Sequence, residues 1–160
     1  MGMKAAIIYH SVTGSTERTA KAIAEQINGD LYKINEKDTA NPSRVLMAGK
    51  IINQLIRPEQ FRDIVSKINL AEYDRIYVGS PCWNYTFSPV IRKFLEEADF
   101  KGKEIVFFLT HDGGPGDTVE KFKKALVGGK FLGSMDFAGV RKTNEKDLKN
   151  NVKRELNRFK

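Results

Sequence analysis

The chain has 160 residues, a hydrophobic content of 41%, a charged content of 29% and a formal net charge of +7. This length and composition predict one globular domain, over residues 1–160, and exclude a disordered or fibrous protein. No stretch approaches the roughly 20 apolar residues that a membrane-spanning helix needs, and the single cysteine, Cys82, excludes an internal disulfide and favours a cytoplasmic location.

The N-terminal part of the chain predicts a strand, a loop, a helix and a second strand. Ala5–Tyr9 is a short apolar run, which is typical of a buried strand. Apolar side chains then recur at helical spacing from Ala20 to Ile27, and Asn28-Gly29 is a typical helix end. Leu31–Ile34 is shorter and half polar, so we expect it to lie nearer the edge of the sheet.

A long connection follows, from Asn35 to Glu72. Within it, Asn41-Pro42-Ser43 indicates a helix start, apolar residues keep helical spacing to Ile56, and residues 61–68 indicate a second short helix. The connection is longer than a strand–helix–strand crossover requires. We therefore expect it to form a flap beside a functional site.

The rest of the chain alternates between strands and helices. Strands are predicted at Arg75–Val78, closed by Gly79-Ser80, at Glu104–Leu109 and within Phe131–Val140, and helices are predicted after the N-cap residues Ser88, Asp117 and Asn144. Because the strands are mostly apolar and alternate with helices, we predict an α/β fold: a doubly wound, five-stranded parallel sheet with helices on both faces.

The positive charge is concentrated in the last quarter of the chain. Residues 1–120 hold 15 Lys/Arg and 16 Asp/Glu, whereas residues 121–160 hold 12 and 4. A nucleic-acid-binding protein would add a recognition motif or interleaved aromatic residues, and the sequence has neither. We therefore expect no nucleic-acid partner and interpret the basic residues as solvated helix faces, with docking of a partner protein as the alternative.

The loop between the first strand and the first helix is rich in hydroxyl groups. Ser11, Thr13, Ser15 and Thr16 surround Gly14 where the helix starts. Free backbone N–H groups and the helix dipole favour an anion at such a position. The loop has no Lys, which distinguishes it from the loops that bind nucleoside triphosphates. The structural alternative is an ordinary Ser/Thr-rich turn with a helix cap.

Three loops are expected at the carboxyl ends of the parallel strands, where ligands bind in open sheets. They are Ser11–Thr16, Ser80–Tyr85 and Thr110–Gly116. The second carries Trp83, and the third has three glycines, which allow a backbone to approach a flat ligand closely. An anion site, an aromatic wall and a glycine-rich edge together predict a mononucleotide-like pocket.

These loops resemble those of the flavodoxin family, which binds FMN. The resemblance covers nearly the whole chain and implies a flavodoxin-like sheet with strand order 2-1-3-4-5. It is carried by Ser11-x-Thr13-Gly14-x-Thr16 for the phosphate loop, by Val78-Gly79-Ser80-Pro81-x-Trp83 for the second loop, and by Phe108-x-Thr110 followed by Gly113-Gly114-x-Gly116 for the third.

The resemblance implies a role for each loop. The first would hold the FMN phosphate, Trp83 would lie against the isoalloxazine ring, the backbone of Pro81–Asn84 would reach its redox-active edge, and the backbone of His111–Gly114 would meet its pyrimidine edge. The implied cofactor-binding residues are Ser11, Val12, Thr13, Gly14, Ser15, Thr16, Ser80, Pro81, Cys82, Trp83, Asn84, Tyr85, Thr110, His111, Asp112, Gly113, Gly114 and Gly116.

Several of these residues have ordinary structural interpretations. Trp83 and Tyr85 are also consistent with packing against neighbouring elements, Cys82 with a small residue beside the pocket, and His111 with a solvated loop position. Many flavodoxins place a tyrosine in the third loop, stacked on the outer face of the ring. In this sequence only His111 is available for that place.

The resemblance implies an FMN-binding electron-transfer protein that passes electrons between redox partner proteins, without a metal site. The alternative is an FMN-dependent oxidoreductase on the same fold, of the NAD(P)H:quinone reductase or protoporphyrinogen oxidase type. The basic charge, the missing third-loop tyrosine and the long 35–72 connection favour this alternative.

Overall fold

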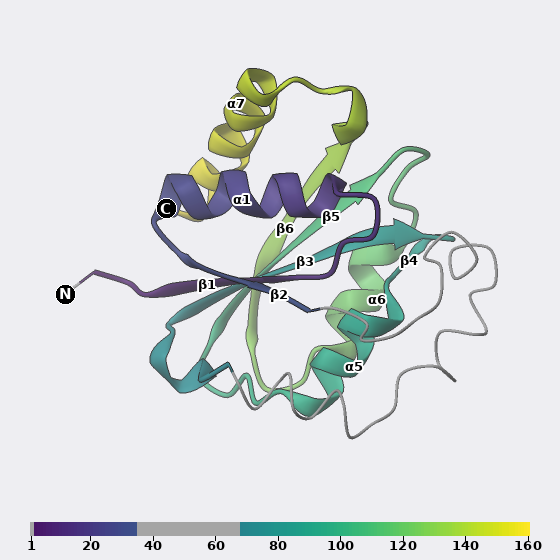
Figure 1. The fold of residues 1–160 in the computed structure, drawn as a ribbon. Helices are drawn as coiled ribbons and strands as arrows, with labels where there is room; N and C mark the ends of the chain where they lie inside the picture. Colours follow the sequence, from purple (N-terminus) through teal and green to yellow (C-terminus); the bar gives the residue numbers. More distant parts are fainter. Residues whose placement is uncertain (1, 35–67) are drawn as a thin grey trace.

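The computed structural model describes residues 2–34 and 68–160, which form a central sheet with helices on both faces (Figure 1). The parallel strands are β1 (Ala5–Tyr9), β2 (Asp30–Lys33), β3 (Arg75–Trp83), β5 (Glu104–His111) and β6 (Lys130–Ala138). They lie in the order β2-β1-β3-β5-β6, and the short β4 (Thr86–Phe87) pairs antiparallel with β3. The predicted doubly wound fold and its order 2-1-3-4-5 are confirmed.

Figure 1 shows α1 and α7 on one face of the sheet and α5 and α6 on the other. The helices are α1 (Ser15–Ile27), α5 (Pro89–Glu97), α6 (Thr118–Ala125) and α7 (Glu145–Leu156), with single 3-10 turns at η1 (Leu70–Glu72), η2 (Val140–Lys142) and η3 (Asn157–Phe159). The helices predicted within residues 43–68 lie outside the described residues, except for Ile68. None of the described helices is long and apolar enough to span a membrane.

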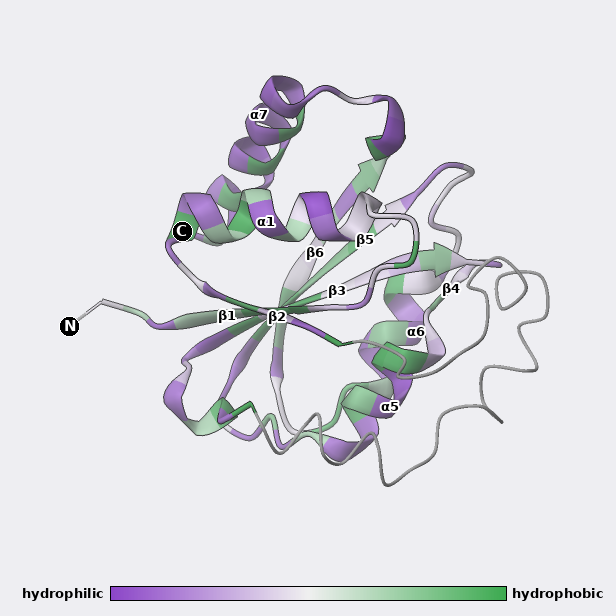
Figure 2. Ribbon diagram, viewed as in Figure 1, coloured by the Kyte–Doolittle hydropathy of each residue, from purple (hydrophilic) through white to green (hydrophobic). Residues whose placement is uncertain are grey.

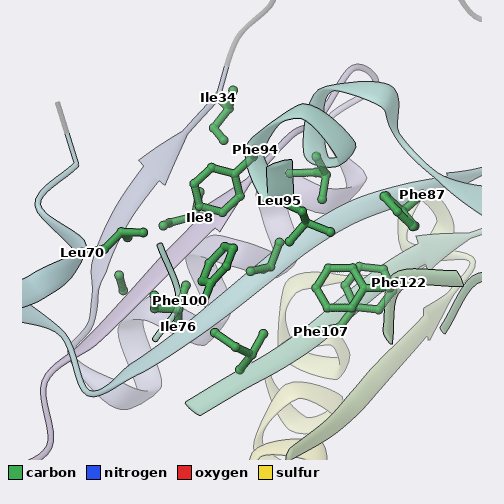
Figure 3. Packing of buried hydrophobic residues seen from close by; sticks show 14 of the residues in the cluster. Ile8, Ile34, Leu70, Ile76, Phe87, Phe94, Leu95, Phe100, Phe107 and Phe122 are labelled. Atoms are coloured by element: carbon green, nitrogen blue, oxygen red, sulfur yellow. The ribbon is translucent and has the colours of Figure 1, made fainter. Parts of the chain in front are cut away.

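The sheet has a separate hydrophobic core on each face because alternate residues of its strands point in opposite directions. In β5, Val106 and Phe108 pack with α1 and α7, whereas Phe107 packs with α5 and α6. The rings of Phe107 and Phe122 stack with centroids 4.0 Å apart (Figure 3). In Figure 2 β1 is largely hydrophobic, whereas hydrophilic residues prevail on α7.

Two of the three predicted N-caps form their side-chain hydrogen bonds. Ser88 accepts a hydrogen bond from the N–H of Ile91 at the start of α5, and Asn144 accepts one from the N–H of Asp147 at the start of α7. Asp117 occupies the N-cap position of α6, but its carboxylate pairs with Lys121, 2.9 Å away, and caps no backbone N–H.

Strand β3 is longer than predicted. The predicted strand ends at Gly79-Ser80, whereas β3 continues to Trp83. Gly79 lies inside the strand, and its lack of a side chain leaves room for a side chain of β5. A Cβ atom at Gly79 would lie 2.1 Å from the ring of Phe108 in β5. The glycine at this position is therefore explained by close packing between β3 and β5.

We expect Gly79→Ala to destabilise the protein by about 1–3 kcal/mol, since the buried Phe108 ring must shift to accommodate the new methyl group. Equilibrium urea unfolding of the ligand-free protein measures this change. Gly113→Ala is the control, because a Cβ at Gly113 meets nothing within 4 Å. An unfolding free energy of Gly79→Ala equal to that of the control would contradict the packing argument.

Candidate functional site

A cleft of about 240 Å³ lies at the carboxyl ends of the strands. Strands β2 and β3 flank β1 on opposite sides, so the cleft opens where ligands bind in open α/β sheets. Its lining residues are Thr13, Ser15, Pro81, Cys82, Trp83, Thr110, His111, Asp112, Val140 and Arg141. Each of the three predicted loops contributes side chains, and Val140 and Arg141, in η2 after β6, add a segment that we call the fourth wall.

Helix α1 begins at the cleft without a side-chain cap from any described residue. Gly14 occupies the N-cap position with a φ of 95°, in the left-handed region that favours glycine. Thr13 and Ser15, on either side of Gly14, line the cleft. The first turn of α1 therefore offers backbone N–H groups, the positive end of a helix dipole and two hydroxyls, which together suit an anion.

The other two hydroxyls of this loop have partners within the protein. Ser11 Oγ accepts a hydrogen bond from the N–H of Gly14 at 3.2 Å, which shapes the turn. Thr16 Oγ1 lies 2.7 Å from Thr110 Oγ1, and both residues are buried. This bond joins the start of α1 to the end of β5. Thr13 and Ser15 are thus the two hydroxyl residues of this loop that line the cleft.

Trp83 lines the cleft and is supported from behind by His10. The two rings meet edge to face, with centroids 5.6 Å apart and an interplanar angle of 84°. His10 is buried, and its Nδ1 lies 3.0 Å from Ser88 Oγ at the start of α5. The orientation of Trp83 therefore depends on β1 and α5, and the sequence analysis did not identify His10 in this role.

A tight hairpin follows Trp83. Asn84 and Tyr85 have φ angles of 50° and 59°, so the turn between β3 and β4 has two successive left-handed residues. A non-glycine residue costs about 1–2 kcal/mol in this region. Lys121 Nζ donates to the carbonyl of Tyr85 at 2.9 Å, and a Cβ at Gly116 would lie 2.6 Å from the Tyr85 ring. These contacts join the hairpin to α6 and to the third loop.

Asn84 and Tyr85 do not belong to the cleft lining among the described residues. The glycines of the third loop are outside it as well, and the conformation of the loop accounts for two of them. Gly114 has a φ of 114°, and Gly116 has a φ of 52° and lies against Tyr85. The remaining implied residues outside the lining are Ser11, Val12, Gly14, Thr16, Ser80 and Gly113.

His111 holds the third loop in place. Its Nδ1 accepts a hydrogen bond from the N–H of Gly114 at 2.9 Å, and its Nε2 lies 2.5 Å from a carboxylate oxygen of Asp136. Because Nδ1 accepts this hydrogen bond, it carries no hydrogen of its own, and Nε2 then carries the ring hydrogen and donates to Asp136. Cys82 Sγ lies 3.1 Å from Thr118 Oγ1, so Cys82 contacts the start of α6, which follows the third loop.

An ion pair crosses the mouth of the cleft. Arg141 Nη2 lies 2.5 Å from Asp112 Oδ2, and both side chains are more than half exposed. Such an exposed pair contributes little to stability, so a ligand can replace either partner at low cost. Arg141 was not predicted as a site residue, although it follows the carboxyl end of β6 and the rule applied to the other strands also points there.

Acidic residues near the cleft are compensated by lysines. Glu17 lies in the first turn of α1, and hydrogen bonds from Lys33 and Lys21 lower its pKa below the ordinary value. Its carboxylate is thus turned toward β2. A hydrogen bond from Lys121 likewise lowers the pKa of Asp117. Within residues 2–34 and 68–160, no group of three or more His, Cys, Asp or Glu residues is arranged to hold a metal ion.

Comparison with known proteins identifies similar chains. The model of a family described as Flavodoxin matches residues 4–154, and no curated protein matches. A Bacteroides uniformis protein described as a flavoprotein has 25% identity and a TM-score of 0.71, covering 96% of this chain and 99% of its own.

Two more solved structures share the fold. A flavoprotein from Lactobacillus acidophilus, in complex with FMN, has 21% identity, a TM-score of 0.67 and coverage of 84% and 93% of the two chains. The two-electron reduced flavodoxin of Megasphaera elsdenii has 19% identity, a TM-score of 0.56 and coverage of 94% and 98%.

The buried bond between Thr16 and Thr110 yields a prediction for a double-mutant cycle. We expect Thr16→Val and Thr110→Val each to destabilise the protein by about 1–3 kcal/mol, since each leaves a buried hydroxyl without its partner. The double variant should lose clearly less unfolding free energy than the two single variants lose together, because both polar groups are then absent. Urea unfolding of the four proteins measures the coupling, and simple additivity would contradict it.

Proposed function

The chain belongs to the flavodoxin family, and from this premise we propose that it binds FMN non-covalently in the cleft and carries electrons between redox partner proteins. The observation that carries the proposal is the uncapped start of α1, with Thr13 and Ser15 on one side of the cleft and Trp83 at the end of β3. A phosphate and a flat ring system match these two features.

The residues of the cleft fit FMN in both parts of the molecule. Backbone N–H groups at the start of α1 and the hydroxyls of Thr13 and Ser15 would bind the phosphate, with the helix dipole opposing its negative charge. Pro81, Cys82 and Trp83 would cover the ring and exclude water from it. Bound FMN would supply the redox chemistry.

The protein itself would position the cofactor and set its surroundings. The contact with buried His10 holds Trp83 at a fixed angle, and the Gly114–His111–Asp136 hydrogen bonds hold the backbone of the third loop. A cofactor that meets preformed walls loses little further freedom on binding. We place the protein in the cytoplasm, because the lone Cys82 suits a reducing compartment.

An FMN-dependent oxidoreductase is the second candidate, and the mouth of the cleft favours it. Across β5 from Trp83, the lining consists of Val140 and the exposed Arg141, which is paired with Asp112. No tyrosine is among the described lining residues. A substrate could therefore approach the cofactor from this side after the ion pair opens.

We expect the ligand-free protein to bind FMN, with Thr13→Ala and Ser15→Ala each weakening binding about tenfold or more because a hydrogen bond to a charged group is lost. Quenching of FMN fluorescence measures the dissociation constant. Ser134→Ala, a hydroxyl variant on β6 outside the cleft, is the control. A wild-type protein that does not bind added FMN would overturn the proposal.

Anaerobic mixing of the FMN-loaded protein with NADH or NADPH separates the two candidates. For an electron carrier we expect flavin reduction over many minutes without a partner, since the protein then has no site that orients the nicotinamide. Stopped-flow absorbance measures the rate. Reduction within about a second would decide for the oxidoreductase, because enzymes typically turn over at about 1–1,000 per second.

A further inference from the structure

The fourth wall has little internal support. It consists of the single 3-10 turn η2, whose backbone hydrogen bonds run from Lys142 N to the Gly139 carbonyl and from Thr143 N to the Val140 carbonyl. Gly139 enters this turn with a φ of 62°. A turn this short has no hydrogen-bond ladder of its own to fix its position. Its place beside the cleft therefore depends on contacts with other elements.

Val140 is buried in the core, Arg141 pairs with Asp112, and Arg18 adds a set of hydrogen bonds to the backbone of this segment. Arg18 Nη1 donates to the Val140 carbonyl at 2.7 Å, and its Nη2 donates to the Thr143 carbonyl at 2.8 Å. Nε and Nη2 both donate to Glu145 Oε1, at 2.8 and 2.6 Å. One guanidinium thus binds the two carbonyls of the segment after β6 and the first residue of α7.

The backbone of Arg18 closes the first turn of α1, next to the proposed anion site. Its N–H donates to the carbonyl of Gly14 at 2.9 Å. Arg18 is therefore joined through its backbone to the loop of Thr13 and Ser15, and through its side chain to the wall of Val140 and Arg141.

We propose that Arg18 is a positioning residue for the cleft, which fixes the fourth wall relative to the start of α1 so that Val140 and Arg141 meet the bound ligand. The inference rests on the proposed FMN binding. Arg18 itself would not touch the ligand. When its side chain is lost, η2 would move away from α1, and the ligand would lose the contacts of Val140 and the nearby charge of Arg141.

Lysine cannot replace arginine in this arrangement. The planar guanidinium directs separate N–H groups at two carbonyls and a carboxylate, whereas an ammonium group at the end of a flexible chain has three donors around one atom. Arg18→Lys keeps the positive charge and much of the side-chain volume. This variant therefore separates the geometry of the bonds from the charge near the phosphate.

Arg75 offers a matched control at the other end of the sheet. Its Nε and Nη2 donate to Glu104 Oε2 at 3.0 and 2.6 Å, and its Nη1 donates to the Phe159 carbonyl at 2.6 Å. It lies at the first residue of β3, whereas the cleft is at the carboxyl ends of the strands. Arg75→Ala removes the same kinds of bonds and leaves the cleft residues in place.

The experiment compares wild type, Arg18→Ala, Arg18→Lys and Arg75→Ala. FMN titration gives the dissociation constant, visible circular dichroism reports the surroundings of the bound flavin, and thermal unfolding without ligand gives the loss of stability. We expect both alanine variants to unfold at lower temperature. Only the Arg18 variants should bind FMN about tenfold or more weakly and alter the dichroism spectrum, and Arg18→Lys should not restore either.

Two results would overturn the inference: wild-type affinity and dichroism in Arg18→Ala, or an equal loss of affinity in Arg75→Ala, which would indicate general destabilisation. Failure of wild type to bind FMN would refute the proposed function instead. Hydrogen exchange of the ligand-free proteins at the amides of Lys142 and Thr143 then still tests whether Arg18 holds η2 in place. Faster exchange is expected in Arg18→Ala and not in Arg75→Ala.

Discussion

The start of helix α1 is the constraint on which the cleft depends. Successive residues of a helix point in directions about 100° apart, and four successive residues of the first turn reach four different parts of the protein. Ser15 lines the cleft and Thr16 bonds Thr110 in β5. Glu17 pairs with Lys33 in β2, and Arg18 binds the segment after β6. The uncapped helix end is therefore held in place by side chains that point away from it.

The fold was largely predictable because the residues within each strand indicate whether that strand is buried. Buried parallel strands have continuous apolar runs, and Ala5–Tyr9 and Glu104–Leu109 both gave this signal. The caps Ser88 and Asn144 act within three residues, so their sequence signal is also local. The end of β3 was not predictable from Gly79, since a glycine that ends a strand and one that makes room for the Phe108 ring look alike in sequence.

The loops that form the candidate site were predictable, but the side-chain contacts within them were not. The rule on carboxyl ends of strands brought Thr13, Trp83 and His111 to one cleft. It could not indicate that Thr16 has an internal partner, because that depends on a contact with Thr110, which is far away in the sequence. The hairpin after Trp83 was hidden for another reason: Asn84-Tyr85 lacks the glycine by which such turns are recognised.

The two sides of the cleft are built with different rigidity, and this difference bears on function. Trp83 packs against His10, which is buried and bonded to Ser88, so this side is attached to buried residues. Arg141 is exposed, and its pairing with Asp112 can be exchanged, while the turn beneath it is held by Arg18. An electron carrier needs a cofactor that is held firmly and reached at one edge. A reductase needs, in addition, a side that admits a substrate. The Trp83 side meets the first requirement for either function, so the choice between them depends on how far the ion pair at the mouth opens when a ligand approaches.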